Sequence, residues 1–199
     1  IHGLLDLSVQ PNKKTLNIEK IDTLRSLYIV SYKSKTKNLQ TLFSSRNLQQ
    51  LIMVMGNQKS LDGIEKSEKL QILYLYYARS LQDISALEKV KKTLKVLCLD
   101  HCPKIEDYSV LEKMENLQTL MIYGNHKISD IQFISKIKSL KRFRFSVNIL
   151  DGDLSPCLKL EEATSMTNRK HYNLKDEELP KNYDCPFGNE GIEEWMLYW

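Results

Sequence analysis

The sequence has few glycines, prolines and cysteines, and it has no long apolar run. Only 7 Gly, 5 Pro and 4 Cys occur in 199 residues. Apolar stretches such as "LQQLIMVM" are far shorter than the roughly 20 residues that cross a bilayer. We therefore expect neither a disulfide-rich scaffold nor a membrane protein.

The cysteines are Cys98, Cys102, Cys157 and Cys185, and their spacing is not that of a disulfide framework. Free thiols favour a reducing compartment, so the sequence predicts a cytoplasmic protein. The chain begins at Ile1 instead of Met, which leaves room for a removed leader.

A strong charge of either sign is also missing. Lys and Arg total 29 and Asp and Glu total 25, which leaves a net charge of +4. A surplus this small, spread along the chain, does not indicate a nucleic-acid or membrane footprint. The hydrophobic content of 42% is that of an ordinary globular chain with a buried core.

The dominant feature is the repeated template L-x-x-L-x-L. Its first positions recur every 22 to 24 residues, at Leu24, Leu48, Leu70, Leu94, Leu117 and Leu140. An earlier, severed copy contains Leu5 and Leu7, and a degraded later copy contains Leu160, Ala163 and Ser165. Self-similarity with a fixed period is the signature of a solenoid, in which each repeat buries its apolar ridge against its neighbours.

These repeats resemble the leucine-rich-repeat family, in the short form found in internalins and related bacterial proteins. The resemblance covers residues 1–168 and implies an α/β solenoid, a horseshoe with a parallel concave β-sheet and short helices or 3-10 turns on the convex side. Eight positions after the start of each repeat, the family places an inward Asn or Cys. Those positions hold Tyr32, Gly56, Ala78, Cys102, Asn125, Asn148 and Asn168.

The segments between the predicted strands carry apolar residues three apart. Ile128, Ile131, Ile134 and Ile137 are one such series, and this spacing suits a short helix or a 3-10 turn. Ser85 with Glu88, and Ser109 with Glu112, also match the S-x-x-E capping box.

The residues between the leucines of each strand are expected to form rows on the concave face, because successive side chains point to opposite faces of a sheet. Large aromatic and apolar side chains gather there, which is typical of an interaction surface, although cross-strand packing alone is the alternative. The predicted partner-binding residues are Tyr28, Ile52, Tyr74, Tyr76, Cys98, Asp100, Met121, Tyr123, Arg142 and Arg144.

No catalytic, metal or cofactor site is predicted. Cys98-Leu99-Asp100 matches a signature of bacterial E3 ligases with leucine-rich repeats, but that signature belongs to a helical domain absent here. Cys98, His101 and Cys102 would have to converge to bind a metal, and Cys98 is expected on the concave surface, where its thiol should react faster than that of inward Cys102. His171 has no partner at a catalytic spacing and is predicted to belong to an end cap.

The repeat pattern stops before the last thirty residues, so residues 169–199 are predicted to form a C-terminal cap or tail. Trp195, Met196, Leu197 and Trp199 could cover the open end of the stack. The alternatives are that this tail reaches a partner, or that it is a loose chain end.

The predicted function is a non-enzymatic, monomeric binding module whose concave face holds another protein. The Lys-, Ile- and Asn-rich composition is similar to that of low-GC bacteria, whose small repeat proteins include immunity proteins that neutralise a cognate toxin. The alternatives are a regulatory or targeting subunit of an enzyme, an internalin-like adhesin, and the repeat fragment of an immune receptor.

Overall fold

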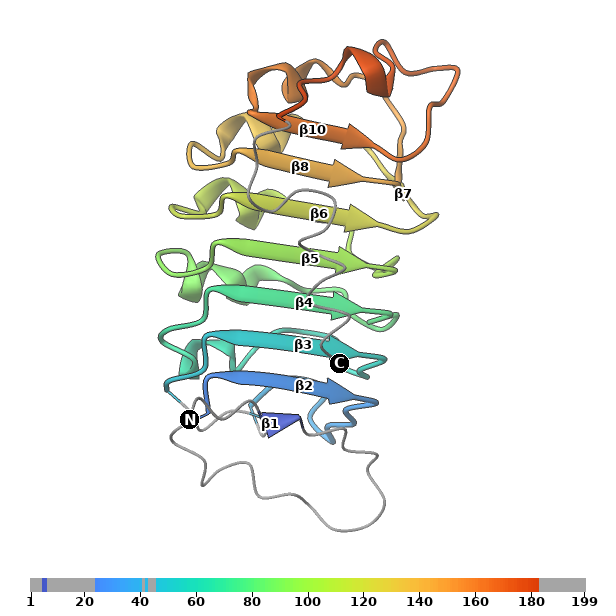
Figure 1. The fold of residues 1–199 in the computed structure, drawn as a ribbon. Coiled ribbons are helices and arrows are strands. Elements are labelled where there is room, and N and C mark those ends of the chain that lie inside the picture. The colour runs from blue at the N-terminus through green and yellow to red at the C-terminus, as the bar shows by residue number, and fades with distance from the viewer. Residues whose placement is uncertain (1–4, 7–23, 41, 43–45, 183–199) are drawn as a thin grey trace.

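The computed structural model describes residues 5–6, 24–40, 42 and 46–182 of the chain. A parallel sheet of eight strands runs along the molecule in the order β1-β2-β3-β4-β5-β6-β8-β10 (Figure 1). The strands are β1 (Leu5–Asp6), β2 (Ser26–Val30), β3 (Gln50–Val54), β4 (Ile72–Tyr76), β5 (Val96–Asp100), β6 (Thr119–Tyr123), β8 (Arg142–Phe145) and β10 (Glu162–Ser165). This is the predicted leucine-rich-repeat solenoid.

The leucine template forms the core because its alternate positions all point to one side of the sheet. Leu73 of β4 is in register with Leu97 of β5, and both are fully buried. The same inward ladder continues through Leu120 to Phe143. Part of the severed first copy also forms a strand, because Leu5 of β1 is in register with Leu27 of β2.

The connecting segments are 3-10 helices, as their three-residue apolar spacing predicted, and they lie behind the sheet in the view of Figure 1. They are η2 (Ile64–Lys66), η3 (Ser85–Val90), η4 (Ser109–Lys113), η5 (Gln132–Lys136), η6 (Ser155–Lys159) and η7 (Asp176–Glu178). A 3-10 helix brings residues i and i+3 onto one side, so η2 to η6 present apolar residues to the core, whereas η7 has no buried residue.

The predicted capping boxes are wrong, because Ser85 and Ser109 do not bond the free N–H groups of η3 and η4 with their side chains. Aspartates two residues earlier act instead. The Ser85 N–H donates to Oδ1 of Asp83 and the Ser109 N–H donates to Oδ1 of Asp107, each at 2.8 Å. The same arrangement recurs at η5 and η6, so an Asx-type turn begins four successive 3-10 segments.

The inward Asn-type position is only partly as predicted. Cys102 is fully buried, and its Sγ lies 3.7 Å from the carbonyl oxygen of Leu75 and 3.5 Å from that of Asp100. Asn125 and Asn168, in contrast, are exposed, so the prediction that they point inward is wrong.

The path of the chain explains the exposure of Asn125. After β6 the chain passes through Gly124 at φ 130° and enters β7 (Lys127–Ile128), which pairs with β9 (Asn148–Ile149) in a second, two-stranded sheet. The chain therefore follows a different path here from that of the preceding repeat, where Cys102 follows β5 and is buried.

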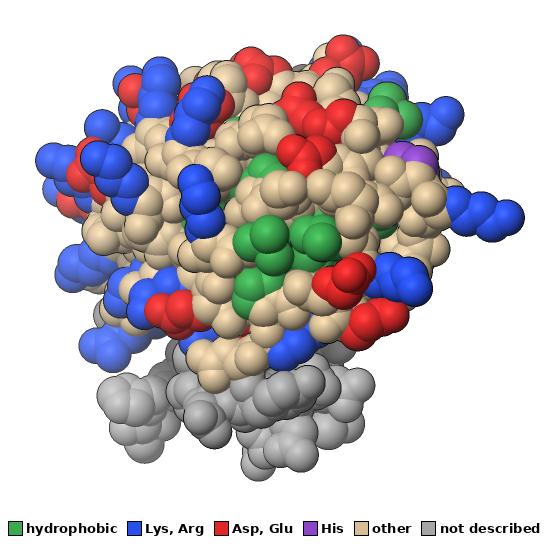
Figure 2. All heavy atoms as spheres, turned by 90° about the horizontal axis from the view of Figure 1, so that it is seen from above, with side chains coloured by type: hydrophobic (Ala, Val, Ile, Leu, Met, Phe, Trp, Pro, Cys, Tyr) green, Lys and Arg blue, Asp and Glu red, His purple; other side chains and the backbone are tan. Residues whose placement is uncertain are grey.

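The outer edge of β10 is covered by the segment 172–182. In β10, the N–H of Ala163 donates to the carbonyl of Pro180 at 2.9 Å. The N–H of Ser165, also in β10, donates to Oδ1 of Asp176 at 2.7 Å. Viewed from this end, apolar side chains remain visible among charged ones (Figure 2). The predicted capping residues Trp195, Met196, Leu197 and Trp199 lie outside the described residues.

Tyr172 anchors this end to the preceding repeats. Its hydroxyl donates to the carbonyl of Val147 and accepts from the N–H of Ile149, both at 3.1 Å. His171 lies beside it, with Nε2 2.9 Å from the carbonyl oxygen of Ile149. Within the described ranges, no helix is long and apolar enough to cross a bilayer.

Candidate functional site

The concave face is the face of the main sheet opposite the 3-10 segments, and the strand register orders its side chains in three rows. The first row is Ser26, Gln50, Ile72, Val96, Thr119, Arg142 and Glu162. The second row is Tyr28, Ile52, Tyr74, Cys98, Met121, Arg144 and Thr164. The third row is Val30, Val54, Tyr76, Asp100 and Tyr123.

Tyr74, Tyr76 and Tyr123 form the centre of this face, and we call them the tyrosine cluster. The rings of Tyr74 and Tyr76 are 6.1 Å apart, and all three side chains are half-buried. None of the three hydroxyls has a hydrogen-bond partner among the residues that the structure describes. Burial and the neighbouring Cys98 thiol raise the pKa of Tyr74 to about 12, and burial likewise raises the pKa of the other two.

Cys98 and Met121 occupy the second row beside the tyrosine cluster, but they are only 1% and 2% exposed. The expectation that Cys98 offers an accessible thiol is therefore wrong. The side chain of Cys98 is short and lies among large neighbours, and burial followed by the charge of Asp100 raises its pKa well above the ordinary value. Neither residue presents surface to a partner in this structure.

Arg142, Arg144 and Glu162 form the C-terminal part of the concave face, and we call them the arginine cluster. Nε of Arg144 donates to Oε1 of Glu162 at 2.8 Å, and Nη2 lies 2.6 Å from the same oxygen. Nε of Arg142 is 3.7 Å from Oε2 of Glu162. The three side chains are only 15%, 14% and 7% exposed respectively, so this is a largely buried ionic group.

Sequence reasoning placed both arginines correctly but missed Glu162. The signal was available, because the degraded repeat at Leu160, Ala163 and Ser165 places Glu162 in the first row by the same template. The register Glu162 to Arg142 shows this placement directly.

The remaining predicted residues lie on the same face. Tyr28 and Ile52 are neighbours in the second row and are half-buried. Asp100 lies in the third row, and its Oδ1 contacts Nδ1 of His101, the residue that follows β5.

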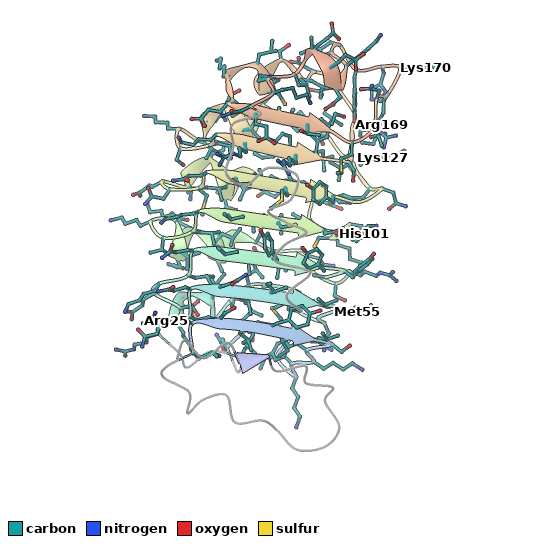
Figure 3. The ribbon with its side chains drawn as sticks, in the orientation of Figure 1. Arg25, Met55, His101, Lys127, Arg169 and Lys170 are labelled. Atoms are coloured by element: carbon teal, nitrogen blue, oxygen red, sulfur yellow. The ribbon has the colours of Figure 1, made fainter. Side chains whose placement is uncertain are left out.

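A row of residues with positive φ follows the strands and forms the edge of the concave face at their carboxyl ends. It contains Ser31, Met55, Tyr77 and His101, with φ between 52° and 57°. Met55 is 57% exposed, and the Tyr77 ring stacks on that of His101 at 4.7 Å. Met55 and His101 point away from the sheet at this edge (Figure 3). Sequence reasoning missed this row, because non-glycine residues rarely adopt such angles and no residue type here marks them.

The catalytic and metal candidates do not assemble into a site. Both Cys98 and Cys102 are buried, and no group of three or more metal-ligating side chains converges anywhere in the described part of the chain. His171 contacts the ring of Tyr172 and the backbone of β9 at the C-terminal end.

Comparison with known proteins agrees with this architecture. A family model described as leucine-rich repeats in two copies matches residues 92–136. No curated protein sequence matches the chain. The fold is thus that of a leucine-rich-repeat solenoid, with a parallel sheet on one side and 3-10 segments on the other.

Its short repeats resemble those of internalins from Listeria monocytogenes. The crystal structure of internalin C2 superposes with a TM-score of 0.60 at 23% identity, covering 80% of this chain and 71% of that one. A second internalin structure, inlF, gives a TM-score of 0.46 at 19% identity and covers 76% of this chain and 57% of that one. The likeness to internalin C2 is one of fold.

Proposed function

We propose that the chain is a non-enzymatic binding module whose concave face holds another protein. The observation that carries this proposal is the tyrosine cluster: three aromatic side chains from β4 and β6, half-buried on the concave face of the sheet, with hydroxyls that no described residue uses. Tyrosine combines a large apolar ring with a polar tip, which is why it is enriched among the residues that dominate binding energy.

The surroundings of the cluster support an interface. Ile52, Val54, Ile72 and Val96 lie beside the tyrosines in the three rows and are also half-buried. A contiguous apolar patch of this kind usually marks an interaction site in a monomeric protein. Cross-strand packing explains contacts between neighbouring rings, but it does not require hydroxyl groups that lack partners.

In its narrower form, the proposal is that the chain is a bacterial, cytoplasmic immunity protein that binds and neutralises a cognate toxin. The fold is equally compatible with a targeting subunit of an enzyme, with an adhesin, and with a receptor fragment. A growth assay separates the first of these from the rest. Expression of the chain should rescue cells from the product of a neighbouring toxin gene, and Tyr74→Ala with Tyr123→Ala should abolish that rescue.

The interface itself is tested by photo-crosslinking in the cells that express the protein. Benzoylphenylalanine replaces Tyr76 on the concave face in one variant and exposed Lys113 on η4 in another. We expect one partner to crosslink from position 76 and not from position 113, and we expect Tyr74→Ala to reduce that yield. Equal capture of the same partner from both positions would contradict the proposal.

A further inference from the structure

The arginine cluster carries a positive charge that the described residues do not neutralise. Two guanidinium groups contribute +2 and Glu162 contributes −1, which leaves a net charge of +1 on the cluster. Glu162 is the only acidic residue in the rows of β6, β8 and β10, since the other positions are Thr119, Met121, Tyr123 and Thr164. This excess charge lies on side chains that are about 85% buried.

The guanidinium groups of the two arginines differ in their hydrogen bonds. Arg144 directs two of its nitrogens at one oxygen of Glu162. Nε of Arg142 is buried and has no hydrogen-bond partner in the described residues, and Oε2 of Glu162 is likewise without one. A guanidinium has five N–H donors and matches a carboxylate in a bidentate arrangement, so Arg142 has the geometry and charge to take a second carboxylate.

We propose that the arginine cluster binds a carboxylate side chain, Asp or Glu, of the partner protein, and that this carboxylate lies in an extended segment whose apolar residues pack on the tyrosine cluster. This inference rests on the proposed function of the concave face and specifies the chemistry of the segment bound there. Arg144 is in register with Met121 of β6, the strand that also carries Tyr123, so the two clusters lie on neighbouring strands of the same face.

The spacing of the strands sets the spacing in the ligand. Tyr74 and Arg144 share the second row and are separated by three strand steps, through Cys98 and Met121. At ~4.8 Å per step this is roughly 14 Å, which an extended peptide spans in about four residues. The ligand segment should therefore run across the strands and carry its acidic residue about four positions from an aromatic or aliphatic one.

The test is selection of a random dodecapeptide library, displayed on phage, against the folded protein. We expect the selected peptides to share an acidic residue about four positions from an apolar anchor. Arg142→Gln should lower the affinity of the protein for these peptides by at least about tenfold, and Arg142→Lys should restore part of that affinity. Replacing the peptide acid by its amide should remove the difference between wild type and Arg142→Gln.

Lys141→Gln is the matched control, because Lys141 is the preceding residue in the chain and its exposed side chain pairs with Glu161. It should leave peptide affinity unchanged. Arg142→Gln keeps the contact between Arg144 and Glu162, so it should fold, and an unchanged melting temperature verifies this.

The remaining outcomes separate the two proposals. Peptides that depend on Tyr74 but are indifferent to Arg142→Gln would overturn the carboxylate inference and leave the proposed binding face intact. Peptides that depend on neither Tyr74 nor Arg142 would overturn both.

Discussion

Arg144 of β8 and Glu162 of β10 form a charge-assisted contact across two neighbouring strands, with Nε of the arginine 2.8 Å from Oε1 of the glutamate. The pair is diagonal in the register, since Arg144 lies opposite Thr164 and Glu162 lies opposite Arg142. One carboxylate therefore holds two guanidinium groups at the C-terminal part of the concave face.

This arrangement makes Glu162 important for folding. We expect Glu162→Gln to lower the free energy of unfolding by about 3–5 kcal/mol, because two largely buried arginines would lose their only counter-charge within the described residues. Urea unfolding measures the effect. The neighbouring Glu161→Gln is the control and should cost about 1 kcal/mol or less, since its ion pair with Lys141 is nearly half exposed. Equal effects of the two substitutions would contradict the account.

The positive φ of Met55 predicts a stabilising substitution. Met55 is at φ 57° and its side chain is mostly exposed, so Met55→Gly relieves a left-handed conformation while losing little packing. We expect a gain of up to about 1 kcal/mol in the free energy of unfolding. Met166 is 63% exposed and is not among the positive-φ residues, so Met166→Gly should instead cost about 0.5–1 kcal/mol. A loss at both positions would show that the turn does not strain Met55.

The buried thiols predict slow labelling and a loss of stability at alkaline pH. Burial raises the pKa of Cys102 and of Cys157 to about 12, and it raises the pKa of Cys98 as well. In a Cys185→Ser variant, the three remaining thiols should react with a thiol reagent only as the protein unfolds.

The sign of the pH effect follows from the same shifts. The unfolded thiols ionise from about pH 8.5 upward, whereas the folded ones stay protonated up to about pH 12. The contribution of the thiols to the free energy of unfolding is therefore fully retained below pH 8.5 and decreases as the pH rises from there toward 12. The tyrosines of the concave face, whose pKa is also raised by burial, lose their contribution in the same direction. Urea midpoints at pH 7 and pH 10 test this, and an unchanged midpoint would be inconsistent with buried, protonated thiols.

We expect the hydroxyl of Tyr172 to stabilise the C-terminal end of the solenoid. Tyr172→Phe leaves the carbonyl of Val147 and the N–H of Ile149 without their shared partner, so it should cost about 1–3 kcal/mol. Hydrogen exchange should accelerate first at β9 and β10. Exchange that accelerates equally in β3 would mean that Tyr172 is not a local anchor.

The strand register was predictable from the sequence because a fixed repeat leaves little freedom. Once Leu73, Leu97 and Leu120 are inward, alternation determines the face of every residue between them. The rows that contain Tyr74, Tyr123 and Arg144 followed without any tertiary information.

What the sequence could not supply depends on contacts between repeats. Cys98 is buried in the row between Tyr74 of β4 and Met121 of β6, its partners in register. Gln58 shows the same limit: it is fully buried next to Gly56, where any side chain would come within 1.9 Å of the Gln58 Oε1 atom. The repeat template predicts the residue type at the position of Gly56. It does not predict that the side chain of Gln58, two residues later, occupies the space beside that glycine.

Tyr74→Ala, Tyr76→Ala and Tyr123→Ala, compared with Leu73→Ala and Leu97→Ala, test the concave-face account most directly. Thermal unfolding and affinity for the partner captured by crosslinking are measured for each protein. The tyrosine substitutions should cost about 0.2–1 kcal/mol of stability for each lost cross-strand pair but about 2 kcal/mol or more of binding free energy. The leucine substitutions should cost about 2–5 kcal/mol of stability through the cavities they leave. Tyrosine variants that fold and bind like the wild type would contradict the account, because the cluster would then serve only to pack the sheet.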